Sequence, residues 1–384
     1  MPERKTTNPG KRTFEGCNFF RQRIVLSALS GIPVQIVDIR KFEDEPGIKE
    51  FEANFLRLMD KLTNGTKIEV NETGTGVLFV PGLLIGGEVD HDCSCERSIG
   101  YYLEGILPMA PFCKNALKLV LRGVTNDKHD ISVDTLKYVS LAVMKRFGLL
   151  EGLDLKISKR GAMPDGGGEI TFTCPVRRKL IPLQLTDPGK LKRIRGTAFS
   201  MKVSPAFVNR MVDSSRKILN QFLSDIYIYT DSVKGAQSGN SPGFGLSIMA
   251  ESTTGVMLCV DACSNAKGDG ETAVVPEDLG KTAAMQLLQE VYRGGCVDSM
   301  HQSLVLVYMA LGQMDVSKVM MGTLTPYTIQ MMRHMKDFFN LMYKIDKVRS
   351  PQTAAEADSG RGSDQKYIVS CMGVGFTNLS KTSI

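Results

Sequence analysis

The chain has 384 residues, 42% of them hydrophobic, with a formal net charge of +6 and a pI of about 8.7. This length exceeds what one core usually organises, so we expect one large domain with an insert, or two domains. No stretch approaches the roughly 18 apolar residues of a membrane span, and the polar N-terminus lacks the apolar core of a secretory signal, so we expect no membrane partner. The charge is below that of a dedicated DNA-binding domain but is compatible with RNA.

Nine cysteines are scattered along the chain, an odd number. Without an export signal they are most simply interpreted as reduced thiols. Cys93 and Cys95 form one close pair with His91 beside them, but the sequence offers no further ligands at zinc-site spacing. We therefore expect no metal.

The first part of the chain alternates between helical and strand patterns. Residues 1–13 are basic and lack apolar periodicity, which predicts a flexible basic arm. The following patterns predict a helix over 19–30, a strand over 34–39, a helix over 48–62 with Gly65 at its C′ position, and a hairpin of 66–70 and 77–80.

The same order recurs twice. We expect helix 101–107, strand 117–121, a helix capped by Ser132 or Asp134, and strands 153–157 and 170–174. After residue 278 we expect helices 279–292 and 302–311, strand 316–320, helix 326–343 and strand 367–371, with disorder over 346–365. The fold class is therefore α/β (α+β), with α-β-α-β-β units in three tandem copies.

Residues 186–277 interrupt the third copy. They read as a strand over 198–203, a helix over 206–223, three further strands, and an exposed loop over 234–245. The predicted organisation is an arm of residues 1–13, units 1 and 2 over 14–185, a small α/β insert over 186–277, and unit 3 over 278–384.

A glycine-rich turn joins two strands of the second copy in the stretch RGAMPDGGGEITFTCPV, residues 160–176. Gly166, Gly167 and Gly168 permit positive φ and the close approach of other groups. One interpretation is a hairpin with a long turn. The other is a backbone surface bared for a ligand and flanked by Lys159 and Arg160. The motif lacks the Walker lysine and the Rossmann spacing, so it does not indicate either nucleotide loop.

This turn, with Arg-Gly ahead of Pro-x-Gly-Gly-Gly, resembles the RNA 3′-terminal phosphate cyclase family. Four other segments resemble one branch of it, the cyclase-like proteins of eukaryotic ribosome assembly: EGCNFFRQR at 15–23, LRGVTND at 121–127, YRGGCVD at 292–298 and VGFTNLSKT at 374–382. The likeness covers roughly residues 14–382. It implies three units, each similar to the C-terminal domain of bacterial translation initiation factor three, with one small inserted domain.

In the cyclases, ATP adenylates a histidine before the RNA 3′ end is cyclised. The matching segment here, MGTLTPYTI at 321–329, contains no histidine, and only a shifted register could bring His334 forward. This chain also differs from the cyclases at three other places. Where the cyclases have an Asp-Gln pair, a glutamine and an arginine, it has His301-Gln302, Glu104 and Glu43. Arg21 and Arg40 match arginines of the family. The resemblance thus implies a retained fold without adenylation, cyclisation or a nucleotide cofactor.

Two sets of basic residues are candidates for binding phosphate. Arg21, Arg40, Arg122, Lys159 and Arg160 lie at strand ends or helix starts that the repeat would bring toward one face, with ordinary ion pairs as the alternative. A denser run of seven in nineteen residues could bind RNA, form a solvated linker or meet an acidic protein: Arg177, Arg178, Lys179, Lys190, Lys192, Arg193 and Arg195. Tyr227 and Tyr229 share one face of a strand and are interpreted as packing or surface residues.

Two functional hypotheses follow. The resemblance implies a non-catalytic protein of small-subunit (18S) ribosomal RNA processing in the nucleus and nucleolus. It would associate with precursor ribosomal RNA, a small nucleolar ribonucleoprotein and a ribosome-assembly GTPase. The alternative is an endonuclease that cleaves precursor rRNA at an early spacer site. Arg333 and Lys336, one helical turn apart, could then steady the phosphate, although a basic helical face more often binds a partner.

Overall fold

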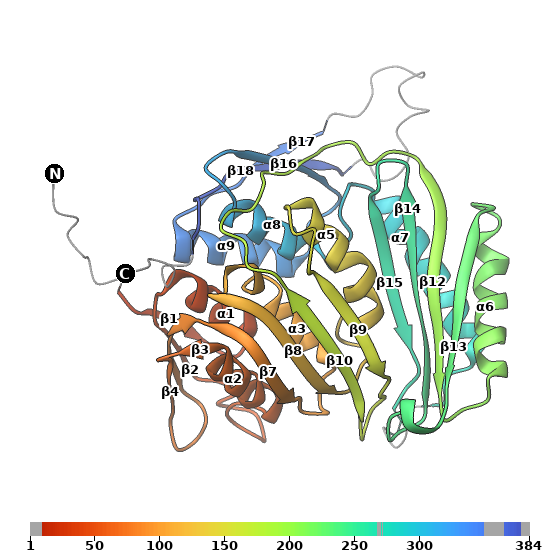
Figure 1. Ribbon diagram of the computed structural model, residues 1–384, viewed down its shortest axis with the longest axis horizontal. Helices are drawn as coiled ribbons and strands as arrows, with labels where there is room; N and C mark the ends of the chain where they lie inside the picture. The colour runs from red at the N-terminus through yellow and green to blue at the C-terminus, as the bar shows by residue number, and fades with distance from the viewer. Residues whose placement is uncertain (1–9, 267–269, 271, 349–364, 378–384) are drawn as a thin grey trace.

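The computed structural model describes residues 10–266, 270, 272–348 and 365–377. It consists of three similar units that pack together and an inserted domain on one side (Figure 1). Among the described helices, none combines the length and the apolar character needed to cross a bilayer.

Each unit is a four-stranded sheet with two helical segments, in the order β-α-β-α-β-β. Unit 1 contains β1 (Arg12–Glu15), α1 (Phe20–Ser30), β2 (Val34–Val37), α2 (Glu50–Leu62), β4 (Lys67–Val70) and β5 (Val77–Val80). Its strand order is β1-β2-β5-β4, with β1 parallel to β2 and the others antiparallel. The short strands β3 (Thr63–Asn64) and β6 (Leu83–Leu84) pair with each other beside it.

Units 2 and 3 repeat this topology. Unit 2 has β7 (Gly86–Asp92), α3 (Ile99–Ile106), η1 (Ala110–Phe112), β8 (Asn115–Gly123), α4 (Val133–Thr135), the π-helical η2 (Leu136–Ser140), α5 (Leu141–Arg146), β9 (Asp154–Lys159) and β10 (Gly168–Cys174). Unit 3 has β11 (Gln184–Leu185), α8 (Gln302–Leu311), β16 (Val316–Met321), α9 (Pro326–Phe339), β17 (Lys344–Lys347) and β18 (Tyr367–Met372). The sheet orders β7-β8-β10-β9 and β11-β16-β18-β17 match that of unit 1, which confirms the predicted threefold repeat.

The helices of the three units meet in one core. α1 contacts both α3 and α9, and α8 contacts α9. Every residue of α8 is buried, because this helix is surrounded by protein and has no polar face. In unit 2, Phe172 pairs with Leu119 on one side and Leu155 on the other, and all three side chains are fully buried. The alternation seen in the sequence therefore marks the buried face of this sheet.

The insert has a core of its own. Its sheet order is β13-β12-β14-β15, built from β12 (Leu191–Met201), β13 (Ile226–Val233), β14 (Gly243–Ser252) and β15 (Met257–Cys263). Two helices, α6 (Ala206–Leu219) and α7 (Pro276–Arg293), pack on each other and on this sheet (Figure 1). Leu279 and Leu287 of α7 belong to the insert core, so α7 is part of the insert although the sequence pattern suggested unit 3.

Other differences from the sequence pattern concern short segments. Each unit begins with a strand that was not predicted: β1, β7 or β11. Arg12 and Thr13 lie in β1 rather than in a flexible arm, while residues 1–9 of that arm lie outside the described residues. Asp346 and Lys347 lie in β17 and not in the predicted disordered loop; residues 349–364 of that loop are also outside the described part. β1, β11 and β17 have only two to four residues each, too few for periodicity to mark.

Candidate functional site

A cleft of about 650 Å³ lies where the three units meet the insert. α1 contributes Arg21, α3 contributes Glu104, the N-terminal turn of α9 contributes Tyr327, and α7 contributes Arg293. The lining carries four cationic side chains, Arg21, Arg97, Lys128 and Arg293, and five carboxyls, Glu104, Asp127, Asp130, Asp261 and Glu290. The cleft is therefore not the strongly positive surface that a nucleotide triphosphate would favour.

Arg21 is held in place from several sides. Its guanidinium forms an ion pair with Glu104, donates to the Tyr101 carbonyl at 2.5 Å, and lies 4.6 Å from the centre of the Tyr101 ring. It also donates to the Tyr327 hydroxyl at 3.2 Å. Burial disfavours the charged guanidinium, but the attraction of Glu104 outweighs it and raises the pKa of Arg21. The arginine is thus charged, ordered and already neutralised.

The other two arginines of the cleft are neutralised in the same way. Arg97 Nε donates to Asp130 at 2.7 Å, and Arg293 donates to Glu290 at 2.5 Å. Burial and the nearby Asp130 raise the pKa of Asp127 to about 6. A phosphate entering this cleft would have to displace a carboxylate from each guanidinium that it met, at the cost of a charge-assisted hydrogen bond.

Three of the four histidines are buried and hydrogen-bonded. His91 contacts Asn54 at 2.8 Å, and burial lowers its pKa to about 4. His334 lies between Gln22 and Gln330, at 3.0 Å from each, and burial likewise lowers its pKa to about 4. His129 is exposed on the loop at the rim of the cleft.

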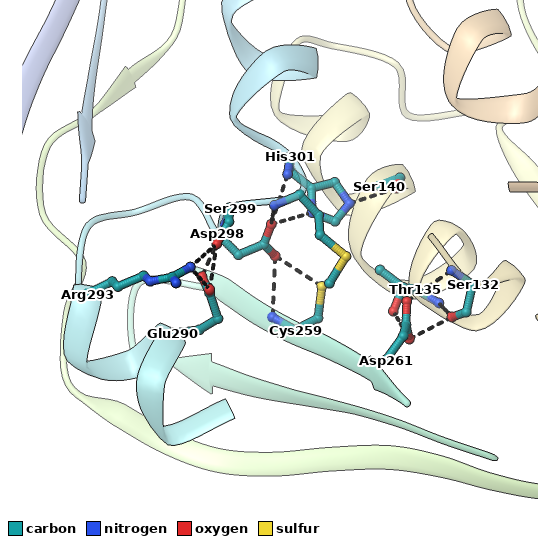
Figure 2. A network of polar contacts seen from close by, with 11 residues as sticks. Ser132, Thr135, Ser140, Cys259, Asp261, Glu290, Arg293, Asp298, Ser299 and His301 are labelled. Carbon is teal, nitrogen blue, oxygen red and sulfur yellow. Dashed lines mark hydrogen bonds and ion pairs between the residues drawn. The ribbon is translucent and has the colours of Figure 1, made fainter. Parts of the chain in front are cut away.

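The third buried histidine, His301, belongs to the network shown in Figure 2. Its Nδ1 lies 2.7 Å from Asp298 and its Nε2 lies 2.8 Å from the Ser140 hydroxyl. Asp298 also accepts from the thiol and the backbone N–H of Cys259, at 3.0 and 3.3 Å. Burial disfavours the imidazolium, but the Asp298 carboxylate outweighs this and raises the pKa of His301. The network joins unit 2, the insert and unit 3 at one point.

Cys259, Asp298 and His301 offer ligand atoms within 4.8 Å of one another, the type of cluster that can bind a transition metal. However, both ring nitrogens of His301 already have protein partners, and Asp298 accepts hydrogen bonds on both oxygens. A metal could bind only by breaking these bonds. The cluster was not visible in the sequence because Cys259 and Asp298 are 39 residues apart.

Comparison with known proteins decides the family. A family model described as RNA 3'-terminal phosphate cyclase matches residues 12–345. The chain belongs to this family. A human protein named RNA 3'-terminal phosphate cyclase-like protein is 57% identical over 371 residues, which cover 96% of this chain and 97% of the relative. A Drosophila melanogaster protein with the name "Probable RNA 3'-terminal phosphate cyclase-like protein" is 50% identical, covering 97% of both chains.

A further relative, from Schizosaccharomyces pombe, is named rRNA processing protein rcl1 and is 40% identical, covering 96% of this chain and 98% of the relative. The 321–329 segment, which resembles the surroundings of the adenylated histidine in the cyclases, runs from the last residue of β16 through a turn into the first four residues of α9. Gln302 donates to the Thr323 carbonyl there at 3.1 Å, and Thr325 caps α9. His334 lies further along α9 with its ring buried, so the helix register does not bring it forward into this segment.

Four of the five predicted phosphate-binding cations form ion pairs. Besides Arg21, Arg40 binds both oxygens of Glu52 at 2.7 and 2.9 Å, and Arg122 binds Asp90, Asp92 and Glu169. Arg160 binds both oxygens of Asp134 at 2.7 and 2.8 Å and Asp231 at 2.7 Å. Lys159 is exposed and has no ion pair among the described residues. Arg21 lines the cleft, whereas Lys159 and Arg160 line a separate groove.

The glycine turn contacts the insert. The backbone N–H of Asn240 donates to the Gly166 carbonyl at 2.9 Å, and Asp165 bonds Ser241. A Cβ on Gly167, whose φ is +81°, would lie 3.0 Å from Asn240, and one on Gly168 would lie 2.6 Å from the Thr125 side chain. Gly166 and Gly168 are therefore buried under protein, whereas Pro164, Asp165 and Gly167 are exposed. The 234–245 loop is exposed at its start, but Gly239 and Ser241 are buried where it meets the turn.

The basic run between the core and the insert divides into paired and unpaired members. Lys192 and Arg193 bind Glu251, and Arg195 binds Asp225. Arg178, Lys179 and Lys190 are exposed and form no ion pair within the described residues, whereas Arg177 is half-buried. Arg333 and Lys336 are both exposed on α9, where Arg333 donates to Gln330 at 3.3 Å, but His334 between them points inward.

Proposed function

We propose that this chain is a non-catalytic member of the cyclase family that acts in ribosomal RNA processing. The observation that carries the proposal is the cleft, in which Arg21, Arg97 and Arg293 are each neutralised by a carboxylate of the same chain. Adenylation needs cations free to bind a triphosphate and a reachable nucleophilic imidazole. The segment between β16 and α9 supplies no imidazole, and His301 and His334 are buried.

The name of the Schizosaccharomyces pombe relative supports the choice of process. Within that process we propose small-subunit (18S) RNA maturation and ribosome assembly in the nucleolus, on precursor rRNA. The proposed partners are a ribosome-assembly GTPase and a small nucleolar ribonucleoprotein. The sequence has no phosphate-binding loop of the GTPase type, so the energy of nucleotide hydrolysis would come from the partner.

Two experiments test the two halves of this proposal. Incubation of the purified protein with labelled ATP should leave no acid-labile protein adduct, and an adduct on any histidine would overturn the loss of adenylation. Depletion of the protein from cells should lower 18S RNA and leave large-subunit RNA unchanged, as read by hybridisation of the precursors. Normal 18S maturation after depletion would reject the proposed role in ribosomal RNA processing.

The endonuclease remains the second candidate, because Arg333 and Lys336 are exposed on one turn of α9. Two cations at this spacing can stabilise a pentavalent phosphate, although His334 is turned inward and cannot serve as their proton carrier. Incubation with a precursor spanning the early spacer decides the matter. Site-specific cleavage that is lost in the Arg333→Ala, Lys336→Ala double variant would establish the nuclease.

A further inference from the structure

A groove of about 270 Å³ opens between unit 2 and the insert, separate from the central cleft. One wall is formed by Lys137 and Tyr138 of the π-helical η2 and by Lys159 at the end of β9. The opposite wall includes Tyr229 of β13. β9 and β13 are edge strands of their sheets, but Thr197 of the inner strand β12 also lines the groove. The insert wall is therefore the face of its sheet that lies opposite the insert core.

The floor of the groove is fixed by Arg160. Its guanidinium joins Asp134 of unit 2 to Asp231 of the insert and lies 4.9 Å from the centre of the Phe199 ring. Its side chain is only 6% exposed. Arg160 is thus occupied in holding the two walls together, and a ligand would meet the other side chains.

The insert presents two aromatic rings to solvent here, Tyr229 in the wall of the groove and Tyr227 just beyond its lining. Tyr227 and Tyr229 lie on one face of β13 and are 64% and 57% exposed. Ile226 and Ile228, which alternate with them, are buried in the insert core on the opposite face. In the parallel register, Tyr227 lies beside Arg195 and Tyr229 beside Thr197. Across the groove, Tyr138 is 44% exposed.

The cations of the groove are available to a ligand. Lys137 and Lys159 form no ion pair within the described part of the chain, in contrast to the arginines of the cleft. The Lys137 ammonium lies 5.5 Å from the centre of the Tyr138 ring, so charge and aromatic surface occur together. Exposed aromatic faces beside free cations are the combination that binds single-stranded nucleic acid, by base stacking and phosphate contact.

We propose that this groove binds a single-stranded segment of RNA, with one base stacked on Tyr229 and phosphates near Lys137 and Lys159. A neighbouring base would stack on Tyr227, which lies beyond the groove on the same face of β13. The proposal rests on the proposed function in ribosomal RNA processing, for which it supplies a site of direct RNA contact. An acidic peptide could use the two lysines but would leave the tyrosine rings without stacking partners. A duplex keeps its bases stacked on one another and offers no free base face to the rings.

The test measures the binding of a fluorescein-labelled 12-nucleotide oligouridine to the full chain by fluorescence anisotropy across a salt series. Tyr227→Ala with Tyr229→Ala should weaken binding by at least about 30-fold, since two stacked bases are lost, and should leave the salt dependence unchanged, because stacking carries no charge. Tyr227→Phe with Tyr229→Phe should bind as the wild type does. Lys137→Ala with Lys159→Ala should reduce the slope of log K against log salt by about 1.4, since each phosphate contact to a single strand contributes about 0.7.

Two matched controls lie outside the groove. Tyr292 is 64% exposed at the end of α7, and Lys217 is exposed on α6, on the opposite face of the insert sheet. Tyr292→Ala and Lys217→Ala should therefore leave both affinity and slope unchanged. The proposed RNA site is wrong if the Tyr227→Ala, Tyr229→Ala variant binds oligouridine with wild-type affinity, or if the wild-type chain does not bind it. Neither result touches the proposed process, which fails only if depletion leaves 18S maturation normal.

Discussion

The guanidinium of Arg21 and the carboxylate of Glu104 form an ion pair inside the cleft. The first residue comes from α1 of unit 1 and the second from α3 of unit 2, so the pair also crosses the boundary between two units. The resemblance to the cyclases assigns a glutamine to the position of Glu104. A neutral amide would leave the guanidinium free to meet an anion, whereas the carboxylate supplies that anion permanently.

Glu104→Gln should therefore make the cleft a better binding site for phosphate. Removal of one negative charge in contact with Arg21 is expected to tighten ATP or inorganic phosphate binding by about 10-fold, since a charge at contact distance contributes more than 1 kcal/mol at a partly buried site. Isothermal titration calorimetry at low salt measures this. Glu88→Gln is the matched control, because Glu88 pairs with Lys118 on an exposed sheet surface. Equal phosphate affinities in the two variants would contradict the interpretation of the cleft.

Arg160→Ala should destabilise the protein strongly. The substitution leaves the carboxylate of Asp134, which is 2% exposed, without its partner, and breaking a buried pair from one side costs about 3–5 kcal/mol. Arg195→Ala is the control, because its partner Asp225 is 54% exposed and such pairs contribute about 1 kcal/mol at most. Urea unfolding followed by circular dichroism compares the two. A loss no greater than that of Arg195→Ala would show that Arg160 does not fix the insert.

Gly167→Ala tests the contact between the glycine turn and the insert. The φ of Gly167 is +81°, and an added Cβ would lie 3.0 Å from Asn240. Gly235→Ala has a comparable backbone conformation, with φ of +63°, but its Cβ would meet no atom within 4 Å. Both variants carry the backbone cost of about 1–2 kcal/mol, and only the first disturbs the contact. Hydrogen exchange at Gly239 and Asn240, whose amides donate to the carbonyls of Arg160 and Gly166, should therefore accelerate in Gly167→Ala alone, and equal exchange in both variants would count against the contact.

Long helices and strands were predictable from the sequence because the spacing of their apolar residues shows which face is buried. The apolar face of residues 48–62 gave α2, and the alternation around Phe172 gave β10. α7 was predicted as a helix, but its apolar face does not say which core it joins. The strands β1 and β11 were missed because two to four residues carry no measurable period.

The candidate site was predictable only in part. The family resemblance pointed to Arg21 and to the negative charge of Glu104. By contrast, the partners of Arg160 lie 26 and 71 residues away in sequence, and only the fold brings them together. Tyr227 and Tyr229 were visible as one strand face, yet their exposure depends on β13 being an edge strand with both insert helices on the other side. Ion pairs between distant segments and the exposure of an edge strand depend on tertiary structure, which local sequence patterns do not determine.

The buried histidines predict how stability changes with pH. Burial lowers the pKa of His334 to about 4, below the value near 6.5 expected for an unfolded chain. Between these values the unfolded chain takes up a proton that the folded chain excludes, so stability that is present above pH 6.5 falls as the pH drops toward 4. For this one residue the loss from pH 7.5 to pH 5 is about 2 kcal/mol.

His334→Gln should remove that part of the acid sensitivity, because glutamine can retain a hydrogen bond to Gln22 without titrating. The measurement is the free energy of urea unfolding at pH 7.5 and pH 5. His301→Gln is the informative comparison, because Asp298 outweighs burial and raises the pKa of His301. The contribution of His301 is therefore complete below pH 6.5 and is lost as the pH rises through its folded pKa, so this variant should lose more stability at pH 5 than at alkaline pH. An unchanged acid slope in His334→Gln would mean that the imidazole is protonated within the folded chain.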